Sequence, residues 1–165
     1  MLNDKKNLIL SLINNETSAS ELIDSYTGKY GQINICNELY NARAEKDSDA
    51  VDLFLYFGEI IKYRYDCIDL LNCLLIETWH RKHEELVRLL ATYNSETSIN
   101  SLFEVSLLKL DYLDYDEDHV LVDKCIRVLA NIRTTESIEK IKKLSHSEKE
   151  AIRKSATKHL RRIRM

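Results

Sequence analysis

The densest group of side chains that could do chemistry is an acidic tract with two tyrosines. It comprises Asp111, Tyr112, Asp114, Tyr115, Asp116, Glu117 and Asp118. Crowded carboxylates raise one another's cost of ionisation, which solvent tolerates and a protein core does not. Tyrosine adds rigid contact area with one polar end. We therefore expect either a contact surface for a basic partner, such as a nuclease cleft, or a solvated loop between helices.

A second group contains Trp79, His80, His83 and Glu84. On a helix, Trp79 and His83 would share an inward face, whereas His80 and Glu84 would share the adjacent stripe and could pair. Zinc peptidases place two histidines four residues apart around the glutamate, but here the histidines are three apart and the glutamate lies outside. Packing with hydrogen bonding at a helix start is the ordinary interpretation. Partner contact through Trp79, His80 and Glu84 is the alternative.

No pattern in the chain favours a metal or a cofactor. The acidic tract lacks the glycine and terminal glutamate of an EF-hand loop, so a cation site is only its third interpretation. Cys36, Cys67, Cys73 and Cys125 are far apart and include no CxxC pair, and most have apolar neighbours. We expect four reduced, buried thiols, no bound metal and no cofactor.

A stripe of cations near the C-terminus could bind phosphate groups. It comprises Lys154, Lys158, Arg161 and Arg162. The ordinary alternative is that these cations complement the dipole of a final helix and keep the end of the molecule soluble. No aromatic residue lies between them in the sequence, so a platform for base stacking is missing there.

Charge divides the chain. Residues 1–123 carry 23 acidic and 11 basic side chains, whereas residues 124–165 carry 4 acidic and 13 basic ones. Opposite ends of the molecule could therefore attract oppositely charged surfaces.

Enzyme signatures are scarce. The sequence contains no Gly-rich phosphate loop, no nucleophile elbow and no cysteine at a recognisable spacing from a histidine. We expect no enzymatic activity.

The elements that position these residues are helices. The chain has no proline and three glycines, and apolar residues recur at helical spacing with no sustained alternation. Capping boxes are expected at Ser18–Glu21 and Ser147–Glu150. The spacing predicts ten helices, at about 3–14, 18–27, 31–46, 49–64, 67–78, 80–92, 97–110, 119–132, 135–145 and 148–163.

The second half of the chain repeats itself. Residues 86–91 (LVRLLA) align with residues 125–130 (CIRVLA), and Glu96-Thr97-Ser98-Ile99 aligns with Thr135-Glu136-Ser137-Ile138, at a constant offset of 39 residues. Ile126-Arg127 recurs at Ile152-Arg153 with an offset of 26. A helical hairpin that stacks on its neighbour produces such a pattern. The longer offset is explained by residues inserted around 111–118.

This pattern resembles HEAT-like repeats, although the usual glycine and proline of the turn are replaced by Arg133 and Thr134. With Trp79-His80 and the acidic tract, residues 79–163 look like small bacterial HEAT-like immunity proteins of polymorphic toxin systems. The resemblance implies an all-α, right-handed superhelical array, and a protein that neutralises a cognate toxin, as in contact-dependent growth inhibition. Residues 1–78 are helices of unassigned type, and 79–165 are the repeats of one α-helical domain.

We therefore expect a cytoplasmic protein that binds a toxin domain, for example a nuclease, and blocks its active site or its access to substrate. It would contact no membrane and would be a monomer or weak dimer. One alternative is a HEAT-like nucleic-acid-binding protein that uses the C-terminal stripe. Another is a general protein-interaction scaffold.

Overall fold

The computed structural model describes residues 2–113 and 119–164, and within them it contains helices and no strand. The all-α prediction is confirmed for these residues. The α-helices are α1 (Leu2–Ile13), α2 (Ala19–Tyr30), α3 (Ile35–Glu45), α4 (Ser48–Ile60), α5 (Ile68–Leu75), α6 (His83–Tyr93), α7 (Ile99–Leu107), α8 (Val120–Ile132), α9 (Thr135–Leu144) and α10 (Glu150–Arg164); η1 (Glu96–Ser98) and η2 (Asp111–Leu113) are 3-10 turns. None of the described helices has the length and apolar character needed to cross a bilayer.

The chain divides into two compact units, Met1–Cys67 and Ile68–Met165. Helix α5 therefore lies in the second unit, together with α6 to α10. The sequence analysis placed the start of the repeats later, at residue 79.

In the first unit, α4 packs against α3 and α1, and α1 packs against α2. The side chains of Phe54 and Phe57 on α4 are fully buried. Glu38 is also buried, and it accepts hydrogen bonds from Lys5 Nζ at 2.5 Å and from Tyr26 Oη at 3.1 Å. These partners compensate a carboxylate that burial alone would disfavour.

Two cysteines of this unit form a disulfide. Cys36 on α3 is bonded to Cys67, 31 residues later in the chain, with their Cα atoms 6.0 Å apart. The prediction of four reduced thiols is wrong for this pair, because the chain after α4 runs back to α3. Cys73 and Cys125 are free thiols.

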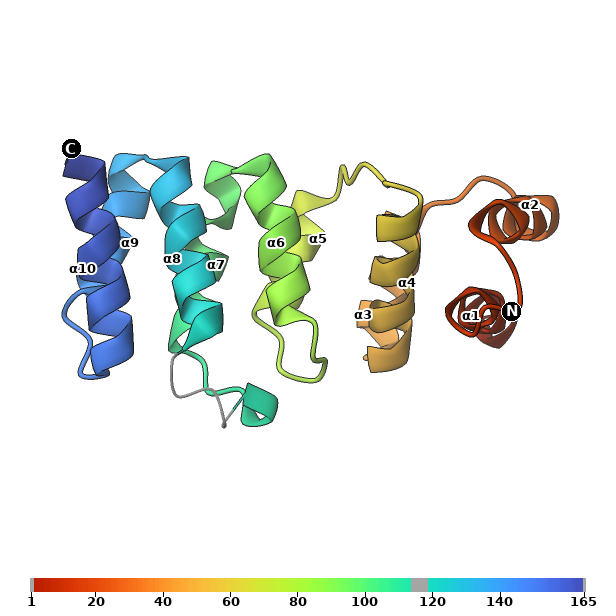
Figure 1. Cartoon of the computed structure of the whole chain (residues 1–165), viewed down its shortest axis with the longest axis horizontal. Helices are drawn as coiled ribbons and strands as arrows, with labels where there is room; N and C mark the ends of the chain where they lie inside the picture. Colours follow the sequence, from red (N-terminus) through yellow and green to blue (C-terminus); the bar gives the residue numbers. More distant parts are fainter. Residues whose placement is uncertain (1, 114–118, 165) are drawn as a thin grey trace. The chain divides into compact units, whose positions relative to one another are not determined.

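The second unit consists of two layers of helices. Figure 1 shows α6, α8 and α10 side by side in one layer and α5, α7 and α9 in the other. Helix α8 packs against α6, α7, α9 and α10, and α5 packs against α6 and α7. Each helix thus buries its apolar face against a sequence neighbour and against the next helix of its own layer.

Residues 86–91 and 125–130, which the 39-residue offset aligns, lie on α6 and α8. Cys125 on α8 and Leu86 on α6 occupy matching positions and are fully buried. Arg88 and Arg127 also match, and both are exposed. Residues 108–119 separate α7 from α8, whereas only 145–149 separate α9 from α10. The predicted insertion is therefore present between α7 and α8.

Local capping explains several helix boundaries. Ser18 accepts the expected hydrogen bond from Glu21 N at the start of α2. The box expected at Ser147 does not form, and α10 begins later, at Glu150. A reciprocal box that the sequence analysis missed joins Thr134 and Ser137 at the start of α9. The sequence analysis missed this box because Ser137 occupies the position where glutamate is usual.

Candidate partner-binding surface

The two groups of residues singled out in the sequence meet at one end of the second unit. Trp79 and His80 lie in the segment 76–82 between α5 and α6, and His83 and Glu84 begin α6. Asp111 and Tyr112 of the acidic tract lie in η2, which follows α7. Tyr112 Oη of η2 lies 2.7 Å from Nδ1 of His83, the first residue of α6, and the two rings stack with centroids 5.6 Å apart. This hydrogen bond fixes η2 against the base of α6.

A pair of stacked imidazoles supports this contact. The rings of His80 and His83 have centroids 4.3 Å apart. His80 Nε2 donates to the Leu74 carbonyl at 2.6 Å, and His80 Nδ1 accepts from the Lys82 backbone N–H at 3.1 Å. His83 Nε2 donates to the Glu77 carbonyl, also at 2.6 Å. Segment 76–82 is thus held by the side chain of His80 in the loop and by that of His83 at the start of α6.

These bonds define the protonation of both histidines. A carbonyl oxygen only accepts, so Nε2 of each ring carries a hydrogen. The Lys82 N–H only donates, so Nδ1 of His80 carries none. Burial lowers the pKa of both rings, that of His83 to about 4, because the imidazolium would lose its hydration. Both histidines are therefore neutral near pH 7.

This geometry corrects three predictions. The helix expected from residue 80 begins at His83, so Trp79 and His80 lie in the preceding loop. His80 is only 1% exposed, so it supports the surface and is not itself available to a partner. The expected pairing of His80 with Glu84 is absent from the described contacts, because both nitrogens of His80 are already used by backbone groups.

Trp79 lies beside the two stacked histidines, in the loop before α6. Its indole Nε1 donates to the Glu77 carboxylate at 2.6 Å, and its ring meets His80 edge-on with centroids 5.2 Å apart. The side chain is half-buried. An anchored but accessible tryptophan is typical of residues that dominate binding energy in protein interfaces.

A cavity of about 380 Å³ opens beside this tryptophan. Its wall combines Trp79 and Arg81 of the loop with Lys109, Asp111 and Tyr112 of the segment after α7. Asp111 and Lys109 are exposed. The cavity thus unites aromatic surface with charges of both signs, and both predicted groups contribute to it.

The remaining predicted contacts of the acidic tract lie outside the described residues. They are Asp114, Tyr115, Asp116, Glu117 and Asp118. The structure therefore bears on the tract only through Asp111 and Tyr112.

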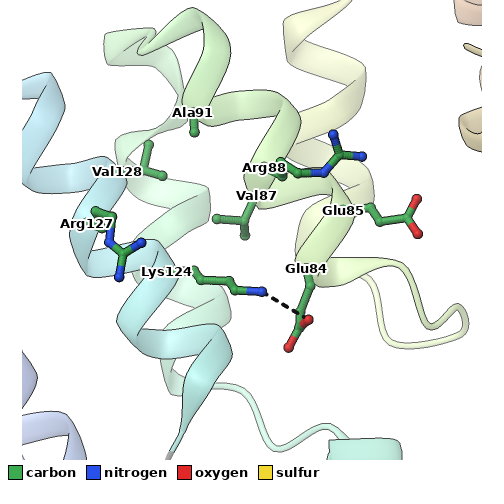
Figure 2. A pocket seen from close by; sticks show the side chains of 8 residues that line it. All are labelled: Glu84, Glu85, Val87, Arg88, Ala91, Lys124, Arg127 and Val128. Atoms are coloured by element: carbon green, nitrogen blue, oxygen red, sulfur yellow. Dashed lines mark hydrogen bonds and ion pairs between the residues drawn. The ribbon is translucent and has the colours of Figure 1, made fainter. Parts of the chain in front are cut away.

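Glu84 faces a different cavity. It pairs with Lys124 of α8 at 3.2 Å, and both residues line a groove of about 320 Å³ between α6 and α8. Figure 2 shows the side chains of Val87 and Val128 between the two ribbons, with the ion pair at one end. Arg127 also lines the groove, as does Arg88, which lies 39 residues earlier in the chain. The repeat of this arginine in the sequence is the signal that could have identified the groove. Glu84 is thus separated from the Trp79 cavity.

The basic stripe is present on α10. Lys154, Lys158, Arg161 and Arg162 are all exposed. They lie on the helix whose other side buries Ile152, Ala156 and Leu160. Lys154 is paired with Glu150 at 2.8 Å, an exposed contact of little energetic weight.

A serine, an aspartate and a histidine also meet between α8 and α10. The Ser155 hydroxyl donates to the Asp123 carboxylate, and His159 Nε2 lies 3.7 Å from the same carboxylate oxygen. No hydrogen bond joins Ser155 to His159 among the described contacts, whereas nucleophilic catalysis needs the imidazole on the hydroxyl. Helix packing is the role this geometry supports.

Comparisons of the chain with family models, with curated proteins and with solved structures give no match.

Proposed function

We propose that this chain is a non-catalytic immunity protein that binds a cognate toxin domain and blocks its active site or its access to substrate. The observation that carries the proposal is the hydrogen bond between Tyr112 and His83, because it joins the two predicted contact groups into one surface. The toxin-binding surface, as used below, comprises Trp79, Arg81, Lys109, Asp111 and Tyr112.

Rigidity supports this role. A surface that is ordered before binding loses less conformational entropy in the complex. The stacked histidines and their bonds to Leu74 and Glu77 hold the loop in place. Trp79 and Tyr112 are then presented as fixed aromatic anchors, which suits tight binding of one partner.

Charge supports a basic partner. Asp111 is exposed at the start of a tract in which Asp114, Asp116, Glu117 and Asp118 follow in the sequence. Nucleases carry basic clefts that receive phosphate groups, and a cluster of carboxylates complements such a cleft and speeds association at low salt. A nuclease toxin is therefore the partner that we favour.

The packing of the helices in the second unit supports the repeat assignment. We propose that α6–α7, α8–α9 and α10 are successive HEAT-like repeats in a right-handed superhelical array. The equivalent burial of Leu86 and Cys125 and the two-layer packing support it. We further propose a cytoplasmic location, where such a protein would meet an incoming toxin. In that compartment, cytosolic reductants would act on the Cys36–Cys67 disulfide of this structure and convert it to two thiols.

A neutralisation assay tests the role. Bacterial cells would express the toxin domain encoded beside this chain, with and without the chain itself. We expect growth to be rescued by the native chain and by a Lys158→Ala variant, and rescue to be lost with a Trp79→Ala, Asp111→Lys double variant. A neighbouring gene product without toxicity, or toxicity that the native chain leaves unchanged, would exclude the immunity role.

A specific observation favours nucleic-acid binding as the second candidate. The ring of Phe103 on α7 lies beneath Lys140 Nζ at 4.7 Å and Lys143 Nζ at 5.9 Å from its centroid. The side chain of Phe103 is half-buried. Phe103 is an aromatic residue beside cations of α9, whereas the basic stripe lies on α10. Binding of single-stranded DNA that weakens steeply with salt and is lost with Lys154→Glu, Arg161→Glu would favour this candidate.

A further inference from the structure

The pair of cysteines in the first unit lies beside an acidic residue that the proposed function does not use. Sγ of Cys36, Sγ of Cys67 and a carboxylate oxygen of Asp66 all lie within 4.8 Å of one another. We propose that, once the Cys36–Cys67 disulfide is reduced, these three groups form a binding site for a thiophilic divalent cation such as Zn²⁺. The metal site, as used below, comprises these three residues.

The backbone around the metal site is held in place by contacts other than the disulfide. The Tyr63 hydroxyl donates to Asn34 Oδ1 at 3.4 Å, next to the start of α3. The buried ring of Tyr65 packs closely against Gly58 of α4. Residues 66 and 67 are therefore fixed over the first turn of α3 by their neighbours, and reduction would leave the ligands close together.

The ligand set matches a soft divalent cation. Zinc is bound by cysteine sulfur and by carboxylate oxygen, and sites with three protein ligands keep a fourth position for water. Two thiolates also select zinc over magnesium or calcium, which prefer oxygen ligands. No side chain of the described residues forms a hydrogen bond or an ion pair with Asp66. Its carboxylate is therefore available to a cation.

Solvent and reductants can reach the metal site at Asp66 and Cys67. Asp66 is exposed and Cys67 is half-buried. A thiol reductant can attack the Cys67 sulfur and release the Cys36 sulfur as a thiolate. A dithiol supplies the two electrons and two protons that convert the disulfide to two thiols, and is itself oxidised to a disulfide. Zn²⁺ then replaces the two thiol protons, which pass to solvent.

Cobalt and zinc titrations of the full-length protein test the proposal. The protein would be reduced with dithiothreitol, freed of reductant without oxygen, and titrated with Co²⁺, which gives a thiolate charge-transfer absorption on binding sulfur. We expect this absorption with one Co²⁺ per chain and its loss on addition of Zn²⁺. The oxidised protein should show none, since its sulfurs are bonded to each other.

Matched variants decide which residues bind the metal. Cys67→Ser should abolish the absorption. Asp66→Asn should weaken Zn²⁺ affinity at least about tenfold, because loss of a group that only supports a metal ligand already costs about that much. Cys73→Ser removes a free thiol outside the metal site and should change nothing. Far-ultraviolet circular dichroism would verify that each variant is folded. Absent absorption in the reduced native protein, equal binding by the oxidised protein, or dependence on Cys73 would overturn the proposal.

Discussion

The Tyr112 hydroxyl lies 2.7 Å from His83 Nδ1, although the two residues are 29 positions apart in the chain. His83 is neutral and donates through Nε2 to the Glu77 carbonyl, so its Nδ1 accepts the hydrogen of the tyrosine. This hydrogen bond therefore connects the segment after α7 to the start of α6.

Replacing Tyr112 with phenylalanine should destabilise the protein by about 1–2 kcal/mol. The variant loses one hydrogen bond and leaves a buried imidazole nitrogen without its donor. Urea unfolding followed by circular dichroism measures the change. The control is Tyr40→Phe, at a tyrosine that is 62% exposed, which should be nearly neutral. Equal effects of the two substitutions would show that the Tyr112 hydroxyl contributes nothing.

Acid should destabilise the protein through His83. The folded-state pKa is about 4, below the ordinary value of 6.5, so the unfolded chain takes up this proton more readily. The contribution to stability is complete above pH 6.5 and is lost as pH falls towards 4. Between pH 7.5 and pH 5 the loss should be about 2 kcal/mol.

The variant His83→Gln should be less stable at pH 7.5, but its stability should fall less between the two pH values. His146→Gln, at an exposed histidine, should keep the native pH dependence. Urea midpoints at both pH values test this. An unchanged pH dependence in His83→Gln would contradict the buried neutral state.

Gly58 and Gly28 should respond oppositely to alanine. A Cβ at Gly58 would overlap the buried Tyr65 hydroxyl, whereas one at Gly28 would meet no atom within 4 Å. Gly58→Ala should destabilise by about 1–3 kcal/mol because the tyrosine ring must shift. Gly28→Ala should stabilise by up to about 1 kcal/mol because alanine favours the helix. Thermal unfolding of the two variants would refute this if both moved in the same direction.

The cap of α9 offers a comparison between adjacent threonines. Thr134 accepts a hydrogen bond from Ser137 N, and Thr134→Ala should cost about 1 kcal/mol. Thr135 is the first helical residue and is exposed. Thr135→Ala should therefore stay within about 0.5 kcal/mol of the native protein. Equal losses, measured by chemical unfolding, would mean that the cap is not what stabilises this helix start.

Local patterns predicted what depends on neighbouring residues. Apolar spacing predicted the helices, and residues aligned by the 39-residue offset, such as Leu86 and Cys125, lie on α6 and α8. The start of α6 was wrong because His80 bonds to the Leu74 carbonyl, a contact that helical spacing cannot reveal. The Cys36–Cys67 bond and the contact of Tyr112 with His83 join residues about 30 positions apart. Such pairings depend on how the helices pack, so a single sequence does not encode them in any local pattern.

The most direct test of the central claim is the affinity of purified variants for the product of the adjacent gene, which we propose to be the toxin domain, measured by isothermal titration calorimetry. Trp79→Ala and Asp111→Lys should each weaken binding at least about 30-fold, corresponding to about 2 kcal/mol. Glu84→Ala, which alters the separate groove between α6 and α8, should weaken it less than about fivefold, and so should Lys154→Glu, Arg161→Glu on α10. Unchanged affinity in both Trp79→Ala and Asp111→Lys, with loss in the α10 variant, would contradict the account.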